Sequence, residues 1–101
     1  MTQFTEEVLI TVQNIPSGKV MSYGQVARLA GNARGARQVV RILHSMSQKY
    51  NLPWYRVINA QGRICIANEI HGAIQRELLQ SEGVVVSVDG SIDLDKYRVE
   101  R

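Results

Sequence analysis

The run Pro53-Trp54-Tyr55-Arg56-Val57-Ile58 combines residue types that rarely come together in a plain hydrophobic core. Trp54, the single tryptophan of the chain, stands between a rigid proline and a second aromatic residue. Arg56 adds a permanent cation, and the two β-branched residues after it favour a strand. An indole has no useful nucleophilic lone pair and no accessible anion. We therefore interpret this run as the centre of a site that binds a ligand and transfers no chemical group to the protein.

Three arginines could supply the contacts of such a site with a polyanion. Arg34, Arg37 and Arg41 are spaced by three and four residues, so on a helix they share one face. The pattern predicts one helix from Tyr23 to Ala30, capped by Ser22, and another from Arg34 to Gln48. Two such helices joined by a glycine-containing turn form a helix-turn-helix, whose second helix enters a groove of DNA.

The charges are segregated along the chain more strongly than the net charge of +3 indicates. Between Val8 and Asn68 there are eight Lys and Arg residues and no Asp or Glu. An electrostatic field of this kind suits a polyanion, most often nucleic acid. The alternative is an ordinary solvated surface of a basic protein.

Length and composition predict a single soluble domain spanning residues 1–101. No stretch approaches the roughly 18 uninterrupted apolar residues of a membrane span, and the N-terminus does not resemble a signal peptide. We therefore expect a cytoplasmic protein without membrane contact. The lone Cys65 rules out an intramolecular disulfide and a cysteine-based metal cluster, so we interpret it as a buried structural thiol and expect no cofactor.

The remaining elements complete a mainly helical α+β domain. We expect a first helix from Thr5, as its cap, to Asn14 and a fourth from about Glu69 to Ser81, with Ile70, Ile74, Leu78 and Leu79 facing inward. Two β-hairpins are also predicted. The first joins Arg56–Ile58 to Arg63–Ile66, and the second joins Val84–Val88 to Ile92–Val99 through an Asp89-Gly90 turn. Helices followed by hairpins form a winged-helix arrangement.

Four motifs occur in order along the chain: Ser22-Tyr23-Gly24-Gln25-Val26-Ala27, Ala30-Gly31-Asn32, Ala36-Arg37-Gln38-Val39 and the run from Pro53 to Ile58. Together they closely resemble the C-terminal domain of O6-alkylguanine-DNA alkyltransferases. In that family the active motif is Pro-Cys-His-Arg-Val, and the cysteine thiolate takes the alkyl group from a flipped guanine. Here Trp54 occupies the cysteine position, as in the alkyltransferase-like proteins, which bind alkylated guanine without repairing it and mark it for nucleotide excision repair.

The resemblance also implies a role for each site residue. Arg37 would fill the place of the flipped base from the minor groove, and Tyr23 would press on the flipped nucleotide's phosphate and line the lesion pocket. Arg34 and Arg41, which the helix-turn-helix pattern places on the same helix face as Arg37, would also contact DNA. The remaining pocket residues would be Pro53, Trp54, Tyr55, Arg56 and Val57, with the main-chain carbonyls of Trp54 and Val57 reading the guanine edge. Trp54 would either form a wall against the alkyl group or fill the space left by the thiol chemistry.

The chain departs from the alkyltransferase pattern at several positions. Tyr55 replaces the activating histidine, a loss without consequence when there is no thiol to deprotonate. The family's acid is expected to persist as Glu82 in a structural role, accepting a hydrogen bond from Tyr55 or Arg56. A glycine pair of the recognition helix aligns with Val40 and Arg41, which affects how closely this helix can approach the groove floor.

Three functions therefore compete. The leading hypothesis is a non-enzymatic sensor that binds O6-alkylguanine in double-stranded DNA as a monomer by flipping the base, with nucleotide excision repair proteins as possible partners. A residual alkyl-transfer enzyme would need a nucleophile and a base, and no such pair is visible in the sequence. A sequence-specific winged-helix transcription factor would be favoured by a dimer interface, which is also not visible.

Overall fold

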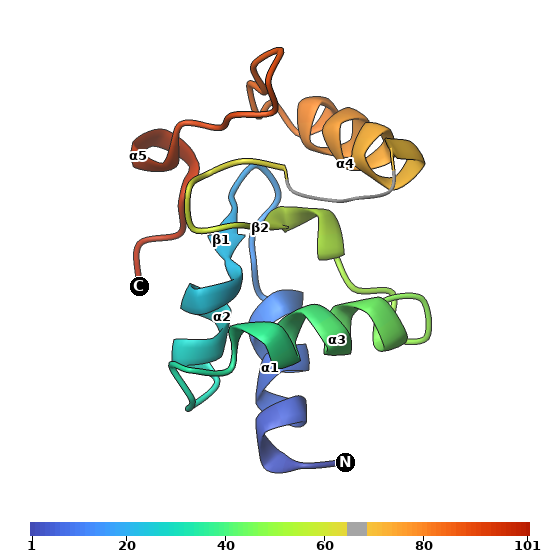
Figure 1. Cartoon of the computed structure of the whole chain (residues 1–101), viewed down its shortest axis with the longest axis vertical. Coiled ribbons are helices and arrows are strands. Elements are labelled where there is room, and N and C mark those ends of the chain that lie inside the picture. The colour runs from blue at the N-terminus through green and yellow to red at the C-terminus, as the bar shows by residue number, and fades with distance from the viewer. Residues whose placement is uncertain (65–68) are drawn as a thin grey trace.

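A computed structural model of the chain describes residues 1–64 and 69–101 (Figure 1). Helices α1, α2 and α3 form one half of the molecule, and α4 and α5 lie at the other end, with the short strands β1 and β2 between the two groups (Figure 1). The elements in order are α1 (Gln3–Gln13), β1 (Met21–Ser22), α2 (Tyr23–Leu29), α3 (Ala36–Met46), the 3-10 helix η1 (Trp54–Arg56), β2 (Val57–Ile58), α4 (Glu69–Ser81) and α5 (Leu94–Tyr97). The mainly helical class predicted from the sequence is confirmed.

Helix α1 is amphipathic and buries the apolar residues that its spacing indicated. Val8 and Val12 are fully buried, and Ile15 follows them into the core just beyond the helix. The predicted cap was wrong: Thr2, not Thr5, caps the helix, because its hydroxyl accepts a hydrogen bond from the Thr5 N–H. Thr5 therefore already belongs to the first turn.

Helices α2 and α3 form the predicted helix-turn-helix. The hydroxyl of Ser22 accepts a hydrogen bond from the Gln25 N–H and caps α2 as expected. At the other end, Gly31 has a φ of +104°, a left-handed conformation that ends the helical path. Helix α3 is shorter than predicted because Gly35 is its cap, so Arg34 lies in the preceding turn and not on the helix. A Cβ on Gly35 would lie 2.7 Å from the ring of Phe4, so a glycine at this position lets α1 pack tightly against the turn.

The first predicted hairpin is not formed in the way we expected. Strand β2 pairs in parallel with β1, placing Val57 opposite Met21 and Ile58 opposite Ser22. The turn after β2 is present, since the Gly62 N–H donates to the carbonyl of Asn59. The described part of the second run, residues 63–64, bonds mainly to the C-terminal segment, and the rest of that run, with Cys65, lies outside the described residues.

The C-terminal segment also differs from the predicted hairpin. Its turn is confirmed, because Gly90 has a φ of +87° and the Ser87 N–H donates to the Ser91 carbonyl. The second run, however, contains α5. The carboxylate of Asp93 caps this helix by accepting from the Asp95 N–H, and a capped helical turn replaces the middle of the expected strand.

Helix α4 has the predicted bounds, and Leu79 is buried as predicted, but Ile70 and Ile74 are not. Ile70 and Ile74 are 71% and 41% exposed, whereas Gln75 is 1% exposed and Leu79 is fully buried. The side-chain NH2 of Gln75 donates to the carbonyls of Tyr55 and Val57, and these bonds offset part of the cost of burying the side chain. Helix α4 therefore packs through a polar contact against the segment that contains the Pro53–Ile58 run.

The core consists of two apolar clusters. One holds the three N-terminal helices together and includes Met21 and Val57 from the paired strands. The other joins Ile58 and Leu79 to the C-terminal segment. Because the adjacent residues Val57 and Ile58 belong to different clusters, the Pro53–Ile58 run lies at the junction of the two halves. No helix among the described residues is long and apolar enough to cross a membrane.

Candidate nucleic-acid interface

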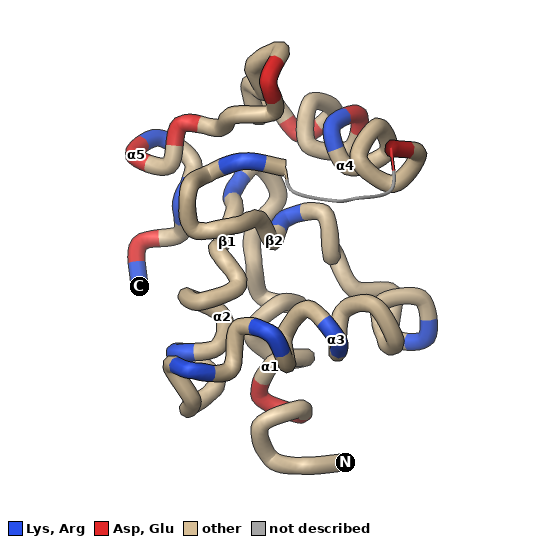
Figure 2. Tube along the Cα trace, in the orientation of Figure 1, with Lys and Arg blue, Asp and Glu red and all other residues tan. Residues whose placement is uncertain are grey.

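Helix α3 presents a cationic surface to solvent. Arg37 and Arg41 are one turn apart, and both are exposed. Neither side chain forms a hydrogen bond or an ion pair with any residue that the structure describes. Lys and Arg residues lie along the helix-turn-helix, whereas most Asp and Glu residues lie on and around α4 and α5, with further acids on α1 (Figure 2). The cations of α3 are therefore available for an anionic partner, as the sequence predicted.

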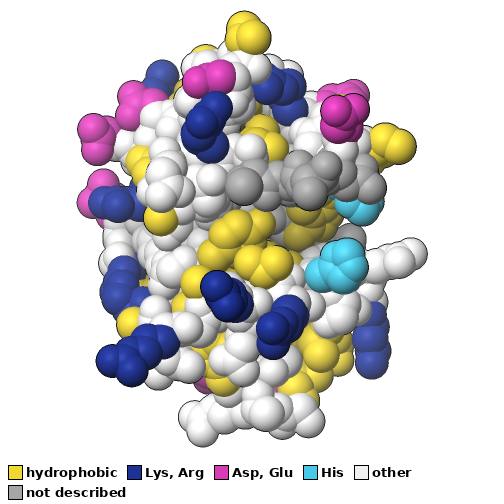
Figure 3. All heavy atoms as spheres, viewed as in Figure 1, with side chains coloured by type: hydrophobic (Ala, Val, Ile, Leu, Met, Phe, Trp, Pro, Cys, Tyr) yellow, Lys and Arg dark blue, Asp and Glu magenta, His cyan; other side chains and the backbone are white. Residues whose placement is uncertain are grey.

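A cavity of about 660 Å³ opens beside this surface. Its walls come from α2, from the C-terminal half of α3, from the loop after α3, from η1 and from α4. The lining residues are Tyr23, Val40, Leu43, His44, Ser47, Gln48, Asn51, Leu52, Trp54 and His71. On this face of the molecule, apolar side chains lie at the centre, with histidines and basic residues beside them (Figure 3). A cavity of this size holds a flat aromatic ligand together with a substituent.

Trp54 forms one wall of the cavity and is held by rings on both sides. The Tyr55 ring lies edge-on at 6.0 Å between centroids, and the His71 ring lies at 6.4 Å with an interplanar angle of 62°. Edge-to-face contacts at these distances are favourable. The indole, which η1 carries, is thus held by rings of η1 and α4 before any ligand enters.

Tyr55 and Arg56 point to a different partner, the carboxylate of Glu82. The Tyr55 hydroxyl donates to Glu82 Oε2 over 2.8 Å, and Arg56 binds both carboxylate oxygens. The same carboxylate accepts from the Gly18 N–H, and Arg56 also donates to the Ile15 carbonyl over 2.8 Å. The predicted bond from Tyr55 or Arg56 to Glu82 is confirmed for both residues, and the network joins η1 to the ends of α1 and α4.

The network changes the acidity of its members. Burial alone would raise the pKa of Glu82, but hydrogen bonds from Arg56, Gly18 and Tyr55 outweigh it and lower the pKa to about 2. Burial and the neighbouring carboxylate raise the pKa of the Tyr55 hydroxyl. Near neutral pH, Glu82 is therefore a weakly basic anion whose two oxygens already accept hydrogen bonds, and Tyr55 is a neutral donor to it.

Comparison with known proteins shows which family the chain belongs to. The family model for the DNA-binding domain of 6-O-methylguanine DNA methyltransferase matches residues 3–84. The chain belongs to this family. Within the family it is similar to two proteins named DNA base-flipping protein. The one from Escherichia coli is 44% identical over 94% of this chain and 73% of the relative, and the one from Vibrio parahaemolyticus is 39% identical over 97% of both.

A relative of known structure is also similar over its whole length. The Schizosaccharomyces pombe protein Atl1, in complex with damaged DNA containing O6-carboxymethylguanine, matches with a TM-score of 0.87 and 32% identity. The match covers 100% of this chain and 98% of that one. The chain thus resembles alkyltransferase-like members of the family, as the Pro53–Ile58 run indicated.

The predicted site residues are divided between the cavity and its support. Tyr23 and Trp54 line the cavity, whereas Tyr55 and Arg56 bind Glu82 and hold η1. Val57 is fully buried and accepts a hydrogen bond from Gln75. These positions leave the proposed roles in DNA binding as predictions.

Sequence reasoning missed His44, His71, Ser47 and Asn51 as lining residues. His44 follows Arg37 by seven positions, which is two helical turns, so it lies on the same side of α3 and this spacing could have identified it. His71 reaches the cavity only through the packing of α4, which local sequence does not reveal. No group of three His, Cys, Asp or Glu residues that could hold a metal occurs among residues 1–64 and 69–101.

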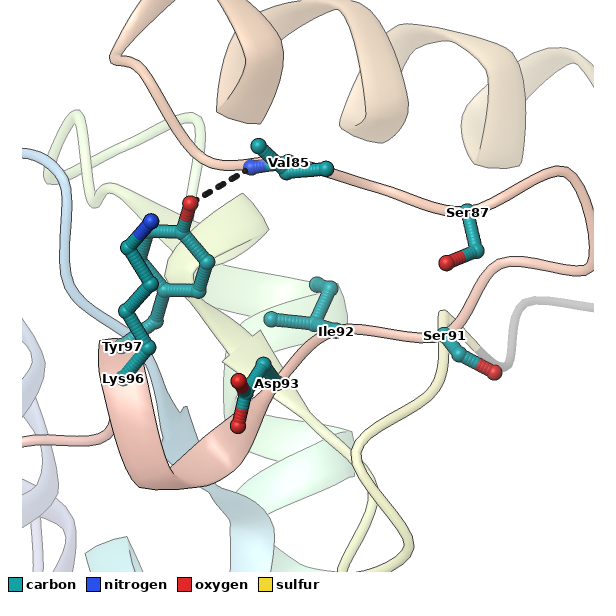
Figure 4. Close-up of a pocket in the computed structure, with 7 residues that line it drawn as sticks. All are labelled: Val85, Ser87, Ser91, Ile92, Asp93, Lys96 and Tyr97. Carbon is teal, nitrogen blue, oxygen red and sulfur yellow. Dashed lines mark hydrogen bonds between the residues drawn. The ribbon is translucent and has the colours of Figure 1, made fainter.

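A second, smaller cavity of about 440 Å³ lies against α5, away from these residues (Figure 4). Its lining residues are Val85, Ser87, Ser91, Ile92, Asp93, Lys96 and Tyr97. The Tyr97 hydroxyl accepts from the Val85 N–H over 3.1 Å and fixes the extended segment after α4 (Figure 4). The cavity against α5 is lined by none of the predicted site residues, so the larger cavity is the candidate site.

Proposed function

We propose that this protein is a non-enzymatic sensor of DNA damage that binds O6-alkylguanine in duplex DNA by flipping the modified base into the cavity beside α3. The observation that carries the proposal is the position of Trp54. The indole lines the cavity, and the cationic face of α3 lies next to it. By the resemblance of the Pro53–Ile58 run, this is the position at which alkyltransferases would carry their acceptor cysteine. The names and complexes of the similar proteins, which include damaged DNA and base flipping, support the same function.

The roles within the site follow from chemistry and resemblance. Arg37 would fill the vacated base stack, because its flat cation can both stack and donate hydrogen bonds. Tyr23 would contact the flipped nucleotide, and Trp54 would pack against the alkyl group, gaining roughly 0.8 kcal/mol per buried methylene. Arg34 and Arg41 would bind phosphates. Pro53 and the support network would keep η1 in place.

The absence of group transfer is part of the proposal. The indole of Trp54 cannot accept an alkyl group as a thiolate does, and Glu82 is bound as an anion to Arg56. The protein would therefore bind the lesion as a monomer and leave it in place. Recruitment of nucleotide excision repair proteins, and a location on DNA in the cytoplasm, are the consequences we infer for the cell.

The direct test compares two duplexes that differ only by one O6-methylguanine. We expect tighter binding to the modified duplex at equal salt, measured by fluorescence anisotropy, and an unchanged intact mass of the protein after incubation. Equal affinities would refute the sensor function and favour a transcription factor. A mass increase of one methyl group would refute the non-enzymatic part.

Binding is also expected to change the fluorescence of Trp54. The chain has one tryptophan, and its ring lines the cavity, so a flipped base that stacks on it should quench its emission. A titration with lesion duplex should give a saturable signal whose midpoint matches the anisotropy Kd, and the undamaged duplex serves as the control. A flat signal under conditions of proven binding would place Trp54 outside the occupied pocket.

A further inference from the structure

The cavity has a polar lining that a simple alkyl group does not require. Besides its apolar walls it contains His44 on α3 and His71 on α4, together with hydroxyl and amide side chains on α3 and in the following loop. An imidazole keeps at least one N–H donor in either charge state. The two histidines enter the cavity from separate elements, and the His71 ring also contacts Trp54 at 6.4 Å.

The charges around the cavity favour an anion. Among the residues that the structure describes, no Asp or Glu lines the cavity. The elements that build the cavity carry the cations Arg28, Arg37, Arg41, Lys49, Arg56 and Arg76 and the acids Glu69 and Glu77. Glu82, just after α4, forms an ion pair with Arg56, so these two charges cancel and five cations remain against two acids. An acceptor group on a flipped base would thus meet N–H donors in a surrounding excess of positive charge.

We propose that His44 and His71 make this pocket selective for guanines whose O6 substituent carries a hydrogen-bond acceptor, above all a carboxylate. This inference rests on the proposed function and names the class of adduct. The similar S. pombe protein, whose complex contains O6-carboxymethylguanine, indicates that the fold has room for an anionic substituent. In this chain the two imidazoles would supply the donors that distinguish such a substituent from an apolar one of the same shape.

The test uses the full chain and four duplexes of one sequence, containing guanine, O6-methylguanine, O6-carboxymethylguanine or O6-isobutylguanine. The isobutyl group has a shape similar to carboxymethyl but accepts no hydrogen bond. The readout is the ratio of the isobutyl to the carboxymethyl Kd. We expect a ratio of about ten or more in the wild type, because hydrogen bonds to charged groups contribute at this level. In H44F/H71F the ratio should fall to about one, and in H44Q/H71Q, which keeps N–H donors, to an intermediate value.

Lys49→Ala provides the matched control, since it removes a nearby positive charge that does not line the cavity. We expect it to weaken binding to all four duplexes and to preserve the ratio. A wild-type ratio near one, or a ratio that is unchanged in the double phenylalanine variant, would overturn the proposal. If no modified duplex binds more tightly than the guanine duplex, the proposed sensor function fails instead. Circular dichroism melting checks that each variant is folded, and if H44F/H71F is not folded, the ratio in H44Q/H71Q is compared with the wild-type ratio instead: an unchanged ratio there overturns the proposal.

Discussion

Replacing Arg37 with alanine is expected to weaken binding to lesion and undamaged duplexes alike, by about 30- to 100-fold. Extruding a base costs a few kcal/mol, and a side chain that fills the vacated stack recovers part of that cost. Arg37 is suited to this task because it lies in the first turns of α3, is exposed, and is not bound to any residue that the structure describes. Its loss removes both the stacking contact and one phosphate-attracting charge.

Two variants separate these contributions. Arg37→Lys keeps the charge but lacks the planar group, so it should retain the salt dependence of binding and still lose most of the affinity. Arg98→Ala removes an exposed arginine that lies outside the helix-turn-helix, and should have only a small effect. The measurement is anisotropy at several salt concentrations, with 2-aminopurine beside the lesion to report unstacking. If Arg37→Ala binds DNA with unchanged affinity, or if Arg37→Lys keeps the full affinity of the wild type, the role of Arg37 in base flipping is contradicted.

Local signals in the sequence were sufficient for the parts of the fold that local interactions determine. Ser22 caps α2 and Gly31 ends it, as the residue types indicated, and the bounds of α4 agree with the prediction. The Asp89-Gly90 turn is likewise a short-range feature. Capping hydrogen bonds and left-handed glycines act within a few residues, so their signals can be read directly from the chain.

Long-range packing decided the parts that were predicted wrongly. The β-branched pair Val57-Ile58 does form a strand, but its partner is Met21-Ser22, far away in the sequence. Nothing in the local pattern distinguishes this parallel pair from a hairpin. The burial of Gln75 in place of Ile74 has the same origin, because the carbonyls that its amide binds come from the Pro53–Ile58 run. The hydrophobic periodicity of α4 alone would predict that Ile74 is buried and Gln75 is exposed.

The residues of the candidate site that belong to a known family motif could be predicted from the sequence, and the residues outside such motifs could not. Trp54 and Tyr23 were found because the family places them together, and both line the cavity. The link from Tyr55 and Arg56 to Glu82 was expected in outline, and the structure adds Gly18 and Ile15. The histidines were not found, since neither belongs to a motif and one depends on how α4 packs.

Replacing Glu82 with glutamine is expected to destabilise the fold by about 3 kcal/mol near neutral pH. The side chains of Arg56 and Glu82 are only 15% and 11% exposed, so removal of the anion leaves a poorly hydrated guanidinium without its counter-charge. The variant should unfold at a lower urea concentration, with an unchanged slope. Asp89→Asn is the matched control, because Asp89 forms an exposed ion pair with Arg63 at 3.7 Å and its amide analogue can still accept from the Ser91 N–H.

The pH dependence gives a second, independent readout of Glu82. Its pKa is lowered from 4.5 to about 2 in the folded protein, which corresponds to about 3 kcal/mol of stability. A group with a depressed pKa contributes fully above its unfolded pKa, and the contribution is lost as the pH falls from about 4.5 toward 2. The wild type and Asp89→Asn should lose this stability over that range, whereas the profile of Glu82→Gln should be flatter. Parallel profiles would show that the stabilising energy lies elsewhere. If the expected profile is found, Glu82 is the group that holds η1 and the indole wall in place.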